Sequence, residues 1–124
     1  MDEEAPIYTR ETANARLDEV RERLARLREA YARIAGHQVA VASKANGNGG
    51  DAGGSAWMEA SRTAADELAW FARLGIVVRD IEQGLIDFPG RREGRDIYLC
   101  WRRGEDTVDF WHDTETGFRG RQPL

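Results

Sequence analysis

Apolar residues in the first third of the chain recur at alternating intervals of four and three positions, which is the spacing of one narrow, coiled-coil-like stripe on an α-helix. Charged residues stand between them, and several glutamates precede an arginine by four positions, the order that supports a helix. The pattern predicts a helix over residues 9–43 with Thr9 as its N-cap. Its apolar stripe consists of Ala13, Leu17, Val20, Leu24, Leu27, Tyr31 and Ile34 and continues in register to Gln38 and Val41.

A second helix is predicted over residues 56–74, because four-three spacing returns there and Gly75 stands where a helix C-terminus favours glycine. Residues 44–55 between the two helices are rich in glycine and polar side chains, so we expect a flexible loop. A single connection between two helices favours an antiparallel hairpin. The second stripe consists of Trp57, Ser61, Ala64, Leu68 and Phe71.

The two predicted helices differ in length, at roughly 50 Å and 30 Å for a rise of 1.5 Å per residue. The end of the first apolar stripe therefore lacks an intramolecular partner unless the remaining chain covers it. A second subunit is the other economical cover. We accordingly predict a homodimer that uses part of this helix seam.

The second half of the chain changes to short β-branched and aromatic runs separated by turn residues. These runs predict a β-meander over residues 76–112 with strands at 76–81, 85–88, 95–101 and 107–112, the second of which stops at Pro89. Residues 113–124 then form a C-terminal tail. The predicted fold is a single α+β domain over residues 1–124, in which a long antiparallel helical hairpin packs on a four-stranded antiparallel β-meander.

Side-chain alternation assigns the strand residues to two faces. A turn centred on Gly104 and Glu105 places Cys100 opposite Asp109 and on the face away from His112. We therefore expect these two side chains not to form a nucleophile and base pair. Ile97, Leu99, Trp101, Val108 and Phe110 are expected in the core, whereas Tyr98, Cys100 and Trp111 share the other face, for which the tail with Phe118 is the simplest cover.

Composition bounds the function. A net charge of −4 argues against a general nucleic-acid binder. The single cysteine cannot form an internal disulfide, the N-terminal residues show no secretory signal, and no apolar stretch reaches the ~18 residues of a membrane span. We therefore expect a cytoplasmic protein with no membrane contact.

The C-terminal forty residues concentrate the chemically useful side chains. A metal site can be drawn from Asp87, Cys100, His112 and Asp113, but the chain has none of the short Cys and His spacings of metal motifs, so we expect no metal and no cofactor. Cys100 is interpreted as a small buried hydrophobe. The candidate binding residues are Asp87, Arg95, Trp111, His112, Arg119 and Gln122, with His112 as the acid or base of an enzymatic alternative.

Three blocks of sequence carry a resemblance: the opening YTRETANARLDEVRERL, the central GLIDFPGRREGRDIYLCWRRGE and the closing FWHDTETGFRGRQPL. Together they resemble a family of small bacterial proteins catalogued as domain of unknown function 2203. The resemblance covers nearly the whole chain except the 44–55 loop. It implies no activity, cofactor or substrate. One departure lies in the opening, where Thr12 replaces the usual glutamate of a capping box, which predicts a weaker helix cap.

The function expected from these observations is that of a non-enzymatic protein–protein interaction module with an unknown protein partner. One alternative is a small-ligand or enzymatic site on the C-terminal sheet and its GRQ tail. The other is RNA or ribosome contact through the arginine-rich hairpin loops, where arginines stand beside aromatic residues. These arginines are Arg91, Arg92, Arg95, Arg102 and Arg103.

Overall fold

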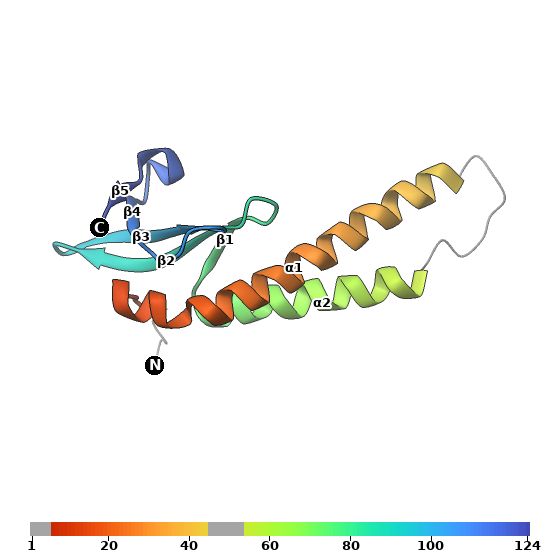
Figure 1. Ribbon diagram of the computed structural model, residues 1–124, viewed down its shortest axis with the longest axis horizontal. Coiled ribbons are helices and arrows are strands. Elements are labelled where there is room, and N and C mark those ends of the chain that lie inside the picture. Colours follow the sequence, from red (N-terminus) through yellow and green to blue (C-terminus); the bar gives the residue numbers. More distant parts are fainter. Residues whose placement is uncertain (1–5, 45–53) are drawn as a thin grey trace.

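The computed structural model describes residues 6–44 and 54–124, and most of the predicted 44–55 loop lies outside these ranges. Two helices come first and are followed by a sheet and a short 3₁₀ helix near the C-terminus (Figure 1). The elements are α1 (Arg10–Lys44), α2 (Gly54–Arg73), β1 (Val77–Asp80), β2 (Leu85–Arg92), β3 (Arg95–Arg102), β4 (Phe110–Asp113), η1 (Gly117–Gly120) and β5 (Gln122–Pro123).

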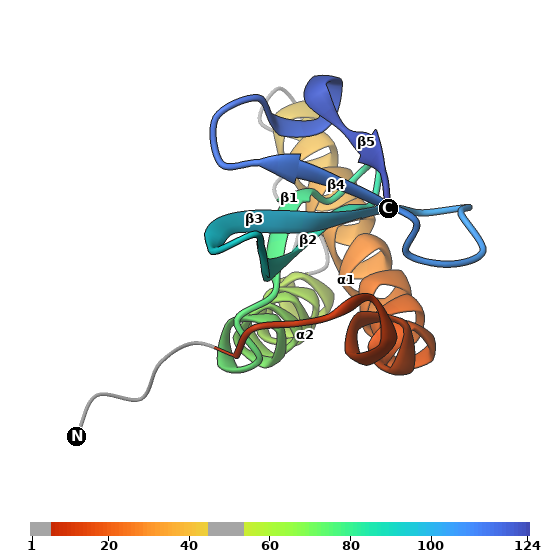
Figure 2. The ribbon, with the colours of Figure 1, turned by 90° about the vertical axis from the view of Figure 1, so that its left-hand side faces the viewer.

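The predicted α+β class is confirmed, but the sheet has five antiparallel strands rather than four, in the order β1-β2-β3-β4-β5. The fifth strand comes from the tail, where Gln122 and Pro123 pair with Trp111 and Phe110. In Figure 2 the two helices lie side by side below β2 and β3, whereas β4, β5 and η1 lie above these two strands. One face of the sheet therefore meets the helices and the other faces the tail.

The start of α1 is capped reciprocally despite the missing glutamate. The Thr12 hydroxyl accepts a hydrogen bond from the Thr9 backbone N–H at 2.8 Å, and the Thr9 hydroxyl accepts one from the Thr12 N–H at 3.1 Å. These are the two bonds of a capping box, with a threonine hydroxyl in place of the carboxylate. Thr12 therefore makes the hydrogen bond to the Thr9 backbone that a glutamate makes in the usual capping box.

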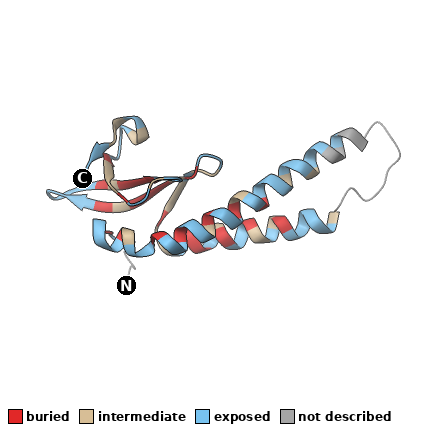
Figure 3. Cartoon of the chain, in the orientation of Figure 1, coloured by how far each residue is buried: buried red, intermediate tan, exposed pale blue. Residues whose placement is uncertain are grey.

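The core lies where the N-terminal half of α1 meets α2 and the face of the sheet turned toward the helices (Figure 3). Leu17, Val20, Leu24 and Leu27 of the predicted stripe are buried there, as are the predicted core residues Ile97, Leu99, Trp101 and Val108. Beyond Ala30 this cover becomes partial: Tyr31, the next member of the stripe, is 44% exposed, and Ile34 is only partly buried against the core. The helix itself continues past Gly36 to Lys44, as predicted.

The prediction that the second strand stops at Pro89 is wrong, because β2 continues to Arg92. The Pro89 carbonyl accepts a hydrogen bond from the Tyr8 N–H at 2.7 Å, and Tyr8 bridges Gly90. Within a strand the N and O of one residue point to the same side, so the proline nitrogen also faces this short bridge. The missing N–H consequently removes no bond between β2 and β3.

The predicted register of β3 and β4 is also wrong. Tyr98 pairs with His112, and Cys100 pairs with Phe110 instead of the predicted Asp109, so each β3 residue faces a partner one position later in the chain than predicted. The reason is a loop that turns inward before β4, where the Val108 N–H donates to Asn14 Oδ1 of α1 at 2.7 Å. A one-residue change in pairing moves side chains to the opposite face. Phe110 accordingly lies on the outer face and not in the core predicted for it.

Candidate functional site

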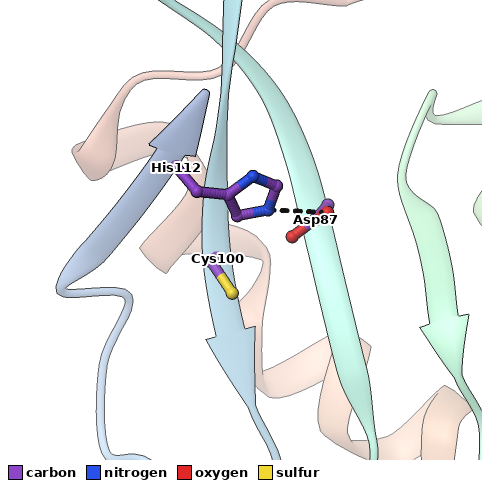
Figure 4. A group of neighbouring side chains, drawn as sticks. All are labelled: Asp87, Cys100 and His112. Carbon is purple, nitrogen blue, oxygen red and sulfur yellow. Dashed lines mark hydrogen bonds and ion pairs between the residues drawn. The ribbon is translucent and has the colours of Figure 1, made fainter. Parts of the chain in front are cut away.

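Three neighbouring strands bring Asp87, Cys100 and His112 together on the face of the sheet turned away from the helices (Figure 4). Asp87 on β2 pairs directly with Cys100 on β3, and His112 on β4 pairs with Tyr98, two residues from Cys100. One ligand atom from each of the three side chains lies within 4.8 Å of the others, and all three residues are buried. The expectation that Cys100 and His112 occupy opposite faces is therefore wrong.

The His112 ring is held at both nitrogens. Nδ1 lies 2.6 Å from the Asp113 backbone carbonyl, and Nε2 lies 3.0 Å from Asp87 Oδ2. A carbonyl oxygen can only accept, so Nδ1 carries a proton and donates it. Nε2 faces the Asp87 carboxyl group, so the ring is held between a backbone carbonyl on one side and a carboxyl oxygen on the other. His112 and Asp87 thus form a buried, hydrogen-bonded pair.

Arg79 on β1 completes this arrangement from the side of the sheet. Its Nε donates to Asp87 Oδ2 at 2.9 Å, and its guanidinium lies 4.8 Å from the centre of the Tyr98 ring. The hydrogen bond to Asp87 raises the pKa of Arg79 above its ordinary value. Arg79 therefore remains a cation and holds one carboxylate oxygen in place, while about half of its side chain stays exposed.

The environment of Cys100 disfavours a thiolate in the metal-free protein. Burial, followed by the nearby Asp87 carboxylate, raises the pKa of the Cys100 thiol to about 12. A cysteine nucleophile needs the opposite shift. The burial predicted for Cys100 is confirmed, but its neighbours on this face are titratable groups rather than hydrophobic ones alone.

A cavity of about 260 Å³ opens beside the Asp87–Cys100–His112 cluster. Leu85 and Arg79 border it on one side, and residues of the tail, including Glu115 and Phe118, form the other wall. The tail is fastened over this face by Arg121, whose guanidinium lies 3.9 Å from the centre of the Phe110 ring and 4.6 Å from that of Phe118. The cavity is thus a space between the sheet and its own C-terminal segment.

Comparison with known proteins places the chain in a family. Residues 6–124 match the family described as uncharacterized conserved protein (DUF2203). The chain belongs to this family. No curated protein and no solved structure matches the DUF2203 chain. In the part of it that the structure describes, neither helix is both long and apolar enough to cross a membrane.

The remaining predicted binding residues of the DUF2203 chain lie elsewhere. Arg95, Trp111 and Gln122 border a second hollow of about 690 Å³ at the far end of the sheet. Trp111 pairs with Leu99 and packs against the core, so its predicted position on the Cys100 face is wrong. Arg119 is exposed on η1 and borders neither hollow. The predicted set is therefore split, and only Asp87 and His112 share the buried site.

The arginine-rich loops of the DUF2203 chain are largely engaged within the fold. Arg91 forms an ion pair with Asp96 at 3.4 Å, and the Arg92 guanidinium lies 4.8 Å from the centre of the Trp111 ring. The ion pair offsets the charge of Arg91, whereas the ring contact leaves the charge of Arg92 in place but holds its guanidinium against the sheet. The nucleic-acid alternative gains no new support from them.

Sequence reasoning missed Arg79 entirely, and it considered Cys100 beside Asp87 and His112 only as a metal site that it then set aside. The sequence pattern assigns both residues to strands. Which face of the sheet each side chain occupies, relative to the neighbouring strand, is fixed only by the pairing register. For Cys100 the loop before β4 decides the register, and for Arg79 the irregular pairing between Val78 and Asp80 decides it. Neither feature has a local sequence signal that we could have used.

Proposed function

We propose that this chain is a small-ligand-binding protein whose site is the cavity between the outer face of the sheet and the C-terminal tail. The observation that carries the proposal is the buried Asp87–His112 pair, whose atoms lie 3.0 Å apart beside that cavity. A concave space with a few converging polar groups is the usual form of a ligand site. Its volume of about 260 Å³ suits a molecule the size of a small metabolite.

Stability alone gives weak grounds for such a pair. Removing two charges from water offsets much of their attraction, so apolar residues of similar volume often serve a fold equally well. Here Asp87 and His112 are only 2% and 3% exposed, and Arg79 adds a further charged group that donates a hydrogen bond to Asp87. A role in binding explains why these polar groups converge beside a hollow that the tail leaves over the sheet.

The cavity wall carries the carboxylates of Asp87 and Glu115 as well as the Arg79 guanidinium, so an anionic group on a ligand would be recognised by direct contact with Arg79 and not by net charge. The half-exposed Arg79 guanidinium borders the cavity, whereas Leu85 and Phe118 supply apolar surface for the rest of a small molecule. Arginine is well suited to carboxylate and phosphate oxygens because its planar donors match their geometry. We therefore expect small carboxylates or inorganic phosphate to bind more tightly than amines of similar size.

Nuclear magnetic resonance on ¹⁵N-labelled protein stripped of metal with a chelator tests this proposal. Acetate, citrate and inorganic phosphate are added separately, with ethanolamine as the cationic comparison. A saturable shift of the His112, Gly117 and Phe118 amides by an anion supports the proposal. The variant Leu85→Trp, which fills the cavity, abolishes the shift, whereas Val39→Trp on the exposed part of α1 preserves it. Absence of saturable shifts with every probe overturns the proposal.

A second candidate function is that of a protein–protein interaction module. It is favoured by the ends of the two helices that lie away from the sheet, which are the C-terminal part of α1 and the N-terminal part of α2. Four large apolar residues are exposed there, namely Tyr31, Val39, Trp57 and Met58. We propose that α1 and α2 form an antiparallel, coiled-coil-like hairpin and that this surface joins two copies in a homodimer. We also propose a bacterial protein of the cytoplasm, and its location there is supported by the single cysteine, which is free.

Sedimentation equilibrium over micromolar concentrations tests the homodimer. The wild-type chain is expected to have twice the mass of one chain, and Val39→Glu combined with Met58→Glu is expected to give monomers. Glu11→Gln, on an exposed face outside this surface, is the control. A wild-type protein that stays monomeric throughout the range contradicts the homodimer.

A further inference from the structure

We propose that Asp87, Cys100 and His112 bind a divalent transition-metal ion, for which Zn²⁺ is the best fit. The ligand atoms come from the neighbouring strands β2, β3 and β4 (Figure 4) and lie within 4.8 Å of one another. All three residues border the cavity. The inference rests on the proposed function, because the ion would form the centre of the same ligand site. The inference adds the identity of the ion and of its three protein ligands.

The orientation of His112 is the first argument. Its Nδ1 donates to the Asp113 backbone carbonyl at 2.6 Å, which fixes the proton on Nδ1 and directs Nε2 into the cluster. Metal-binding histidines characteristically use one ring nitrogen as the ligand and donate the other N–H to a carbonyl or carboxylate. His112 therefore already has the hydrogen bond that a metal ligand needs. In the metal-loaded chain, Nε2 and the Asp87 carboxylate would both face the ion.

The spacing of the donor atoms is the second argument. Atoms bound tetrahedrally to one Zn²⁺ at about 2.0–2.3 Å lie roughly 3.3–3.8 Å from each other. His112 Nε2 and Asp87 Oδ2 are 3.0 Å apart, and the Cys100 ligand atom lies within 4.8 Å of both partners. Side-chain rotations that shift these donor atoms by about an ångström would bring all three to binding distance. No change in strand pairing is needed.

The chemical types of the donors select the metal. Mg²⁺ and Ca²⁺ require oxygen ligands, so a set containing a thiolate and an imidazole excludes them as preferred ions. One sulfur, one nitrogen and one carboxylate oxygen suit Zn²⁺. The two negative charges of a carboxylate and a thiolate also balance a divalent cation. Arg79, bonded to Asp87 Oδ2 at 2.9 Å, acts as the outer partner that orients the carboxylate.

The number of protein ligands indicates how the ion would be used. Structural zinc sites are closed by four protein ligands, whereas three protein ligands leave a position for water or another molecule. In the described residues the cluster contains three potential ligands, and the cavity of about 260 Å³ adjoins them. The open position would therefore face the space assigned to the small anionic ligand.

Titration of the chelator-treated full chain with Co²⁺ alone tests the metal site. Because Cys100 is the sole cysteine, a thiolate-to-cobalt charge-transfer band in the near ultraviolet reports this residue without the need for a variant. The expected result is one Co²⁺ per chain, with visible bands of a tetrahedral site, all displaced by one equivalent of Zn²⁺. A folded wild-type chain without the charge-transfer band overturns the inference.

Variants then assign the other ligands. Cys100→Ser is expected to remove the charge-transfer band, and Asp87→Asn or His112→Gln to weaken Co²⁺ binding at least on the order of a hundredfold. Arg79→Gln, which changes only the outer partner, is expected to weaken it about tenfold. Asp109→Asn, a carboxylate outside the cluster, is the control and leaves binding unchanged. Circular dichroism verifies that each variant is folded, and unchanged binding in folded Asp87→Asn and His112→Gln contradicts the ligand set.

The two proposals fail differently. Anion-induced shifts in the stripped chain without any Co²⁺ binding overturn the metal site and leave the ligand cavity standing. A Cys100–Co²⁺ band without anion binding to either the stripped or the Zn²⁺-loaded chain supports the metal site and overturns the small-anion function. Absence of both signals overturns both.

Discussion

Arg121 donates hydrogen bonds from one terminal amino group to both carboxylate oxygens of Glu105, at 2.9 and 2.8 Å. This pair connects the tail with the loop between β3 and β4. The same Arg121 guanidinium packs on Phe110 and Phe118, which lie on the outer face of the sheet and on η1. The wall of the candidate site therefore depends on one arginine that is bound by both its charge and its flat surface.

Replacing Arg121 by lysine is expected to loosen the tail. Lysine keeps the charge but loses the planar contact and the paired hydrogen bonds, so we expect the free energy of unfolding to fall by about 1–2 kcal/mol. Amide hydrogen exchange over residues 114–124 is expected to accelerate as well. Arg119→Lys, on the exposed side of η1, is the matched control, and equal effects of the two variants would contradict this role of Arg121.

Gly84 and Gly94 offer a paired test of close packing in the hairpin turns. Both have positive φ, at 68° and 77°, but a Cβ at Gly84 would lie 2.6 Å from the Arg103 Cβ, whereas a Cβ at Gly94 meets no atom within 4 Å. Gly94→Ala is expected to lower the free energy of unfolding by about 1 kcal/mol through backbone strain alone. Gly84→Ala should add a clash and lower it by about 3 kcal/mol. Urea denaturation measures both values, and equal losses would show that the predicted clash is relieved.

Glu67 provides a test of a buried charge between the helices. It is 5% exposed and accepts hydrogen bonds from Arg23 at 3.2 and 3.3 Å, while the Arg23 guanidinium also covers Trp70. Arg23→Ala leaves this carboxylate without its main partner, so we expect a loss of about 3 kcal/mol in the free energy of unfolding. Arg23→Met combined with Glu67→Leu is expected to restore most of the loss. Thermal and urea unfolding measure it, and a double variant as unstable as Arg23→Ala disagrees with this explanation.

The Cys100 thiol predicts how stability depends on alkaline pH in the metal-free chain. Its pKa rises from 9.0 to about 12 on folding, chiefly because of burial. Above pH 9 the unfolded chain releases this proton while the folded chain retains it, so the stabilisation is complete below pH 9 and is lost as the pH rises toward 12. Over this range the free energy of unfolding should fall more steeply for the wild type than for Cys100→Ala. Parallel curves in urea titrations would contradict the shift.

The sequence alone predicted the elements whose signals are local. The four-three stripe from Ala13 to Ile34 predicted α1, because one side of a helix must be apolar to pack. The short β-branched runs and their glycine turns likewise predicted an antiparallel sheet after α2. The three sequence blocks also predicted the family, which the match over residues 6–124 confirms.

Tertiary structure decided which residues share the site. The contact of Asn14 with Val108 shapes the loop before β4, and that loop sets the register that places His112 on the face of Cys100. The two residues that set it are 94 positions apart in sequence. Side chains alternate with a period of two, so a register that differs by one residue reverses every assignment of face. Local pattern could therefore identify the strands, but only long-range packing could bring Asp87, Cys100 and His112 to one point.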